Sequence, residues 1–216
     1  MRLQVPLIHR GNRVAAVIIG GVALVVLYLL PAHLQFRPPV DLDESRLDSW
    51  VPFLEWTIWI YASEYLLLFV VILCGGDDRD RSRTFYALFL AAIIGVPIFL
   101  LWPTHVMLRS PSFAGATGLL WRGLYSVDTA ANALPSLHAA NTCLAAARLW
   151  RFGGAWRFIA PIWAVLILVS TLTTKQHYAI DIVGGVALAA ICFALVRGGL
   201  RFRVPQTYHG PDQRPG

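Results

Sequence analysis

Charged residues are scarce in this sequence. Only 14% of its 216 residues are Asp, Glu, Lys or Arg, whereas 57% are hydrophobic, and the mean hydropathy is +0.60. A water-soluble domain carries roughly a quarter charged residues, so the composition excludes an ordinary soluble protein. Several apolar runs approach the roughly 20 residues that a helix needs to cross a bilayer core of about 30 Å. Most of the chain is therefore expected to lie in a lipid bilayer.

Cysteine and lysine are also rare. The three cysteines, Cys74, Cys143 and Cys192, lie in or at the ends of apolar segments, and their odd number argues against a disulfide framework. Lysine occurs once, at Lys175, against 17 arginines. The net charge of +6 and the pI near 9.7 do not indicate a nucleic-acid partner, because the arginines flank apolar runs and form no basic stripe with aromatic residues.

Six apolar segments are candidate membrane spans. We expect an all-α, polytopic protein: a six-transmembrane-helix bundle that forms a single membrane domain over residues 1–216, with 197–216 as a cytoplasmic tail. No small-residue cleavage site follows Leu30, so the first segment is expected to be a retained helix rather than a signal peptide. The predicted spans are 14–34, 51–74, 84–102, 136–150, 156–173 and 178–196.

The fourth span is rich in alanine, which is typical of a helix packed inside a bundle. Ala139, Cys143 and Ala147 recur at every fourth residue, and Gly185 and Ala189 repeat this spacing in the sixth span. We expect these two faces of small residues to meet.

The basic residues indicate an orientation. With both termini in the cytoplasm, 13 of the 18 basic residues are internal and five are external, as the positive-inside rule requires. The segment 103–134, the start of the fourth span and the link between spans five and six then share the external or periplasmic face. The internal residues are Arg2, Arg10, Arg13, Arg79, Arg81, Arg83, Arg148, Arg151, Arg157, Arg197, Arg201, Arg203 and Arg214, and the external ones are Arg37, Arg46, Arg109, Arg122 and Lys175.

The run Pro135-Ser136-Leu137-His138 opens the fourth span on that face. Ser136 is suited to cap the helix, whose N-terminus offers free N–H groups to an anion. His138 lies in the same opening turn. A capping serine beside an interfacial histidine is common, so this run carries weight only together with its neighbours.

A second cluster, residues 175–181, precedes the sixth span and reads Lys-Gln-His-Tyr-Ala-Ile-Asp. His177 and Asp181 are four residues apart, so on a helix they share a face and can form a hydrogen bond. A carboxylate on one imidazole nitrogen fixes the tautomer and leaves the other nitrogen as a nucleophile or base. An ion pair between Lys175 and Asp181 is the structural alternative. A carboxylate at the start of a membrane span favours the functional interpretation.

Arg109 and Arg122 lie in the external segment. Arginine binds phosphate through two parallel hydrogen bonds, so either residue is a candidate to clamp a phosphoryl group, and either can instead face lipid headgroups.

The histidine clusters resemble motifs of the type 2 phosphatidic acid phosphatase superfamily of membrane enzymes. The second motif of that family, P-S-x-H, is intact at 135–138. The third motif, S-R-x5-H-x3-D, is similar at 170–181, with Thr171 in place of the arginine. The first motif, K-x6-R-P, is reduced to Arg109-Ser110-Pro111, with Trp102 in place of the lysine.

Within this superfamily, the chain resembles the branch that includes inositol-phosphorylceramide synthase. Tyr125, Asp128 and Asn132 ahead of the P-S-x-H motif carry that similarity, as does the pattern Lys-Gln-His-Tyr-x-x-Asp. The resemblance extends from Trp102 to Gly185.

The resemblance implies a phosphatase or phosphotransferase that acts on a phospholipid or polyprenyl phosphate without a metal or cofactor. The role of the nucleophile that forms a phosphohistidine falls on His177, and that of the general acid falls on His138. Ser136 is expected to hold phosphoryl oxygens. Because the family's lysine and arginine are missing, we expect Lys175 and Arg109 to supply the positive charge, with Arg122 as a further candidate. The sequence leaves open the lipid, the acceptor (water or an alcohol) and the oligomeric state.

Three other functions fit parts of the sequence. His138, His177 and Asp181 would form a two-histidine, one-carboxylate metal site, although nothing else soft or anionic lies nearby on the external face. Facing histidines can ligate a haem, but both lie at one end of the predicted bundle. Glu55 and Glu64 in the second span would suit a transporter. Nine residues apart, they point to opposite sides of a helix, and we interpret them as separately paired structural groups.

Overall fold

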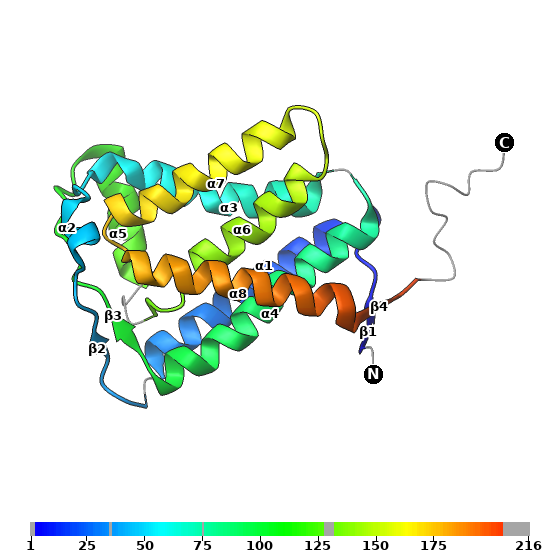
Figure 1. Ribbon diagram of the computed structural model, residues 1–216, viewed down its shortest axis with the longest axis horizontal. Coiled ribbons are helices and arrows are strands. Elements are labelled where there is room, and N and C mark those ends of the chain that lie inside the picture. The colour runs from blue at the N-terminus through cyan, green and yellow to red at the C-terminus, as the bar shows by residue number, and fades with distance from the viewer. Residues whose placement is uncertain (1–2, 35, 75, 128–131, 205–216) are drawn as a thin grey trace.

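The fold is a bundle of long helices that run side by side (Figure 1). It is seen in a computed structural model that describes residues 3–34, 36–74, 76–127 and 132–204. Each of the six apolar segments contains one long helix, so the predicted mainly helical class is confirmed. These helices are α1 (Arg13–His33), α3 (Ile58–Leu73), α4 (Asp78–Leu101), α6 (Leu137–Trp150), α7 (Trp156–Thr173) and α8 (Ala179–Gly199).

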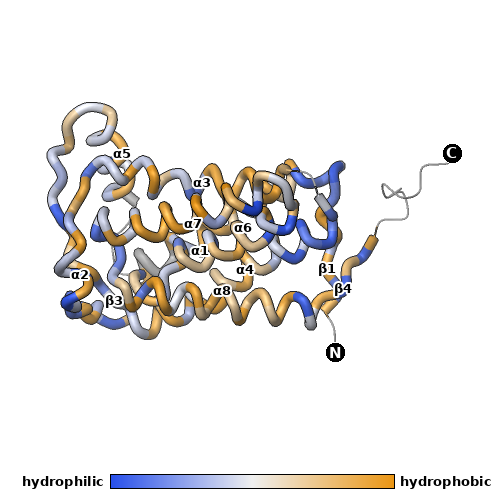
Figure 2. Tube along the Cα trace, turned by 45° about the horizontal axis from the view of Figure 1, so that its top comes forward, coloured by the Kyte–Doolittle hydropathy of each residue, from blue (hydrophilic) through white to orange (hydrophobic). Residues whose placement is uncertain are grey.

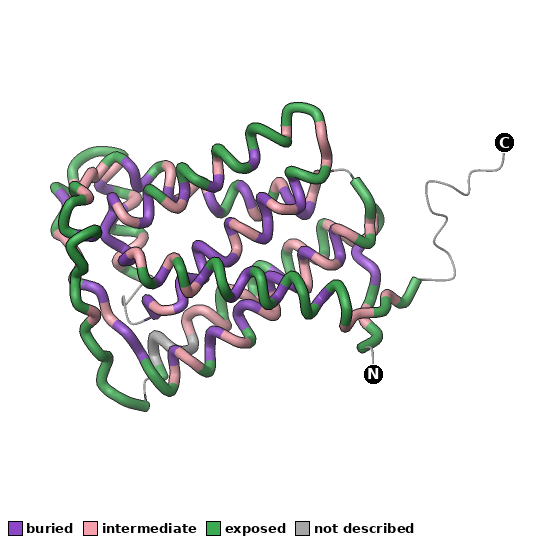
Figure 3. The backbone as a smooth tube through the Cα atoms, viewed as in Figure 1, coloured by how far each residue is buried: buried purple, intermediate pink, exposed green. Residues whose placement is uncertain are grey.

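The outward sides of the helices are apolar. Hydrophobic residues run along most of their length (Figure 2), and many lie on the exposed sides (Figure 3), among them Ile18 and Val22 of α1 and Ile162 and Val165 of α7. Such a surface is suited to lipid rather than water. In the described residues, four helical stretches are long and apolar enough to cross a bilayer: Glu55–Leu73, Asp78–Leu101, Trp156–Thr173 and Ala179–Gly199.

Helix α6 lies at the centre of the bundle and packs against α3, α4, α7 and α8. Its 14 residues span about 21 Å, because an α-helix rises by about 1.5 Å per residue. Helix α8 approaches it most closely at Gly185, where an added Cβ would lie 2.3 Å from the Ser136 carbonyl oxygen and 2.7 Å from Ala139 Cβ. The contact expected between the small faces of these two helices is therefore present.

Short elements join the helices at each end of the bundle. The parallel pair β1 (Leu3–Pro6) and β4 (Leu200–Arg203) lies at one end, so the first and last described segments are neighbours (Figure 1). The opposite end carries β2 (Val40–Asp41) paired with β3 (Thr104–His105), the helices α2 (Arg46–Trp50) and α5 (Gly115–Val127), and the 3-10 turn η1 (Glu55–Thr57). The expectation of a purely helical protein missed these strands, because two to four residues carry no usable periodicity.

Helix α4 begins earlier than its hydropathy suggested. It starts at Asp78, ahead of the apolar run that opens at Thr84, because the Asp77 side chain caps it by accepting from the backbone N–H of Arg79. Acidic side chains in its first turn, Asp78 and Asp80, also favour a helix N-terminus.

Candidate active site

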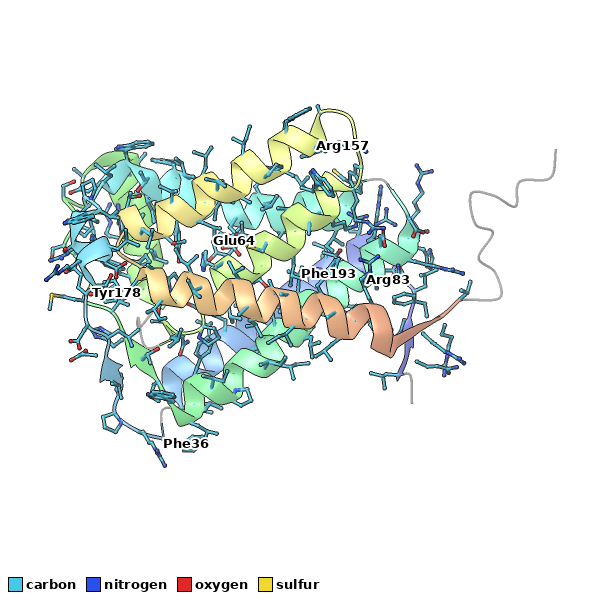
Figure 4. All side chains as sticks on the ribbon, viewed as in Figure 1. Phe36, Glu64, Arg83, Arg157, Tyr178 and Phe193 are labelled. Atoms are coloured by element: carbon cyan, nitrogen blue, oxygen red, sulfur yellow. The ribbon has the colours of Figure 1, made fainter. Side chains whose placement is uncertain are left out.

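The two histidine motifs meet at the end of the bundle opposite β1 and β4. The ring centroids of His138 and His177 lie 6.1 Å apart, although the residues are on different elements. Figure 4 shows Tyr178, the neighbour of His177, at this end and Glu64 between the helices further along the bundle. The predicted convergence of these motifs is thus seen directly.

Ser136 fixes the start of α6. It is fully buried, and its Oγ accepts a hydrogen bond of 3.2 Å from the backbone N–H of Ala139, which is the predicted N-cap. Its own backbone N–H donates to the carbonyl of Asp181 at 3.0 Å. The opening turn of α6, with His138, is therefore tied to the first turn of α8.

His177 lies outside α8, so the expectation that it shares a helical face with Asp181 was wrong. The helix begins at Ala179, and Asp181 caps it by accepting from the backbone N–H of Tyr178 at 2.8 Å. The same Asp181 oxygen lies 3.5 Å from Nδ1 of His177. This is an ion-pair distance rather than a hydrogen bond, and His177 Nδ1 and Asp181 Oδ1 have no hydrogen-bond partner among the described residues. The contact involves Nδ1 only, so Nε2 of His177 does not face Asp181.

The turn that presents His177 has the geometry of a Schellman motif. The N–H of Lys175 donates to the carbonyl of Leu172 at 3.1 Å, and the N–H of Gln176 donates to the carbonyl of Thr171 at 3.1 Å. Lys175 has a φ of 54°, a conformation that glycine usually supplies and that costs other residues roughly 1–2 kcal/mol. A residue other than glycine is uncommon in this conformation.

Lys175 and Arg109 converge on one carboxylate that the sequence did not reveal. Lys175 Nζ donates to Glu44 Oε1 at 3.1 Å and to the carbonyl of Asp48 at 2.5 Å, and Arg109 Nη2 donates to Glu44 Oε2 at 3.2 Å. The partner of Lys175 is thus Glu44 and not Asp181. No spacing rule links positions 44, 109 and 175, so only the acidic character of the segment 41–48 could have hinted at this arrangement.

Asp48 connects α2 to the same turn. It is buried, and its Oδ1 accepts from the backbone N–H of Ala179 at 2.7 Å, while Oδ2 forms a capping box with Ser45. The N-terminus of α8 therefore rests on α2. Burial raises the pKa of the neighbouring Tyr178 hydroxyl above its ordinary value, so this side chain adds no negative charge at neutral pH.

Arg122 is not brought to the histidines. It lies exposed on α5 and donates to the carbonyl of Phe113 at 2.6 Å, and no contact joins it to His138 or His177 within the described chain. Of the residues that carried the branch resemblance, Tyr125 lies on α5 and its hydroxyl donates to the Arg109 carbonyl at 2.8 Å, whereas Asn132 is buried and forms a backbone bridge with Thr104. Asp128 lies outside the described residues.

His138 is surrounded by side chains of α3. Its ring stacks on Tyr61 with centroids 4.3 Å apart, and its Nε2 lies 2.8 Å from Oε2 of Glu64. The distance is that of a hydrogen bond, although the alignment departs from a linear one. Glu55, by contrast, accepts from the backbone N–H and hydroxyl of Ser112 at 2.9 and 2.7 Å. The two glutamates are separately paired, as expected, but Glu64 touches the site.

An apolar cavity of about 300 Å³ lies between α4 and α8. It reaches Pro135, the residue before the N-cap of α6, and its lining includes Ile94, Ile98, Leu188 and Ile191. In the residues that the structure describes, no three His, Cys, Asp or Glu side chains converge as metal ligands.

Comparison with known proteins agrees with this geometry. The model of the PAP2 superfamily matches residues 27–195, and the chain therefore belongs to that superfamily of lipid phosphatases and phosphotransferases. A stretch of 94 residues is 31% identical to the inositol phosphorylceramide synthase catalytic subunit aur1 of Schizosaccharomyces pombe. The match covers 44% of this chain and 22% of that protein, so the chain spans only a small part of this relative. The resemblance drawn from the two histidine motifs is confirmed.

Proposed function

We propose that this chain is a membrane-embedded lipid-phosphate phosphatase or phosphotransferase that forms a phosphohistidine on His177. The observation that carries the proposal is the meeting of His138 with the His177–Asp181 pair, their rings 6.1 Å apart, at positions that match the second and third motifs of the family.

In the proposed first step, Nε2 of His177 attacks phosphorus and the bond from phosphorus to the lipid oxygen breaks. The electron pair goes to that oxygen, which takes a proton from His138 and leaves as the alcohol. In the second step, water or an alcohol attacks the phosphohistidine and gives its proton to His138, which frees His177. Asp181 holds the His177 ring and stabilises its positive charge in the intermediate.

Phosphate binding is assigned to Lys175 and Arg109, with Ser136 and the start of α6 beside them. A transferring phosphoryl group needs positive charge and fixed hydrogen-bond donors more than any other catalytic group. Both cations already bind one carboxylate, Glu44, in a geometry that an anion can share. Arg122 has no comparable contact and is the weaker candidate.

The acceptor separates two candidate activities. Water would make the protein a phosphatase, whereas a lipid alcohol would make it a transferase of a phospho-headgroup, as in inositol-phosphorylceramide synthesis. The 31% identity to a synthase subunit favours the second activity. The apolar cavity that ends at Pro135 supports a substrate with a hydrocarbon chain in either case.

All six long helices are proposed to cross the membrane as one domain, with the site facing the external or periplasmic side. Pairing of β1 with β4 places the first and last described segments at the same end, and most of the arginines accompany them. Exposed tryptophans lie at both ends, with Trp50, Trp56 and Trp102 at the end that carries the histidines and Trp150 at the other, as at the two membrane interfaces.

The test is a search for the covalent intermediate. Purified protein is incubated with a panel of radiolabelled lipid phosphates, with and without inositol or ceramide, and the products are measured by mass. We expect an acid-labile, base-stable label on the wild-type protein and none on His177→Ala. His138→Ala should be labelled about 10²–10⁴-fold more slowly by a substrate with a poor leaving group. A label that survives in His177→Ala, or that disappears when divalent metal is chelated, would contradict the proposal.

A further inference from the structure

Glu64 is an acidic residue inside a membrane helix that the proposed reaction has not used. It lies on α3, its side chain is 3% exposed, and its Oε2 is 2.8 Å from Nε2 of His138. A carboxylate in this environment is costly to keep ionised unless a positive group or a hydrogen-bond donor faces it. The imidazole of His138 is such a partner.

The surroundings hold the His138 ring in one place. Tyr61 stacks on it at 4.3 Å with an interplanar angle of 21°, and the Tyr61 hydroxyl lies 3.5 Å from Nδ1. Tyr65 contacts the ring edge-on at 6.1 Å. The residues Tyr61, Glu64 and Tyr65 follow one another at helical spacing on α3, so a single helix face orients the ring.

The two histidines thus have parallel supports. His177 faces Asp181, which comes from the helix that follows it, and His138 faces Glu64, which comes from a separate helix. A carboxylate beside one imidazole nitrogen fixes the orientation of the ring and leaves the other nitrogen to meet the substrate.

We infer that Glu64 is a positioning residue for His138: it holds the ring in the orientation needed for proton delivery to the leaving oxygen. This inference rests on the proposed function. Because Nε2 of His138 faces Glu64, Nδ1 is the nitrogen that gives its proton to that oxygen in the first step and takes one back from water or the alcohol in the second, so Glu64 exchanges no proton with the substrate. The ionisable groups that face His138 are Glu64, Tyr61 and Tyr65 of α3 and His177 across the site, with Cys143 further along α6.

The experiment compares Glu64→Gln with the wild-type protein on two substrates, a long-chain lipid phosphate and nitrophenyl phosphate. The rate at which the lipid phosphate labels His177, measured in a single turnover, should fall by roughly 10²-fold, at the lower limit of the 10²–10⁴-fold that a general acid contributes. Nitrophenyl phosphate should be affected far less, because its leaving group needs little protonation.

The matched control is Glu55→Gln, which changes the other glutamate of the same membrane span and should behave like the wild type. The double variant Glu64→Gln/His138→Ala should be no slower than His138→Ala, because Glu64 acts only through that ring. If Glu64→Gln does not fold, Glu64→Asp keeps the charge one methylene further away, and it should show the same dependence on leaving group at a smaller amplitude.

Three outcomes would overturn the inference: wild-type rates in Glu64→Gln, an equal loss on both substrates, or a further loss when the change is added to His138→Ala. Failure of the proposed function looks different, because the wild-type protein itself would then form no phosphohistidine.

Discussion

At the end of the bundle that carries β1 and β4, three arginines donate to the carbonyls that close α3, whereas at the opposite end Lys175 and Arg109 share the carboxylate of Glu44. Four carbonyls at the C-terminus of α3, those of residues 71–73 and of the C-cap Cys74, accept no hydrogen bond from within the helix. Arg13 donates to Leu73 at 2.6 Å, Arg81 to Ile72 and Cys74 at 3.0 Å each, and Arg148 to Val71.

Cationic side chains therefore have two kinds of partner in this protein, main-chain carbonyls and a carboxylate. An arginine bound to main-chain oxygens completes a helix end, and no ligand can replace those oxygens without breaking the structure. Lys175 and Arg109 share the carboxylate of Glu44, a group whose charge and oxygen atoms resemble those of a phosphate. The arginines that close α3 therefore hold the fold, whereas Lys175 and Arg109 are the cations that we propose an anionic substrate engages.

Of the substitutions that test this comparison, those at Lys175 are expected to cause the largest loss of activity. Lys175→Ala should lower kcat/KM for a lipid phosphate by roughly 10²–10³-fold, the usual cost of removing one charged or hydrogen-bonding group from a transition state. Lys175→Gly should lose as much activity while its backbone adopts the positive φ without strain. Lys175→Arg should keep part of the activity. Steady-state kinetics and thermal unfolding in detergent measure both properties, and full activity in Lys175→Gly would move the clamp to Arg109 or Arg122.

A smaller effect, on stability instead of activity, is expected at Arg81. Arg81→Met leaves the carbonyls of Ile72 and Cys74 without a donor, at about 1–3 kcal/mol for each buried unpaired group. The folded fraction should keep the wild-type kcat. The control is Arg83→Met, whose partly exposed ion pair with Asp80 is worth about 1 kcal/mol at most. Thermal unfolding gives the stability change, and a loss of kcat in folded Arg81→Met would show that the two ends are not separate in function.

A labelling experiment asks whether the two ends lie on opposite sides of the membrane. It is expected to change neither activity nor stability. Single cysteines replace Ser110 at the end that carries the histidines and Ala155 at the end that carries β1 and β4, both exposed, in a protein whose three native cysteines are alanine. An impermeant thiol reagent added to intact cells should label Ser110→Cys only. Ala155→Cys should react after lysis. The reverse pattern would invert the proposed orientation.

The sequence predicted the parts of this structure that depend on local composition. Apolar runs located the long helices, and the motif spacing located His138, His177 and Asp181, which do come together. Glu44 and Lys175 are 131 residues apart and meet only because α2 folds over the turn after α7, which no periodicity encodes. Glu64 was recognised as an unusual charge, but its partner became visible only when α3 was packed against α6.

The close approach of α8 to α6 at Gly185 fixes the spacing between the two helices. Because Gly185 brings no side chain to this contact, the separation of the two helices is set by the Ser136 carbonyl and the Ala139 methyl group. Under the proposed function, changes in the apolar cavity or in the segment that carries Glu44 would alter which lipid enters and how it is held without changing the separation of α6 and α8.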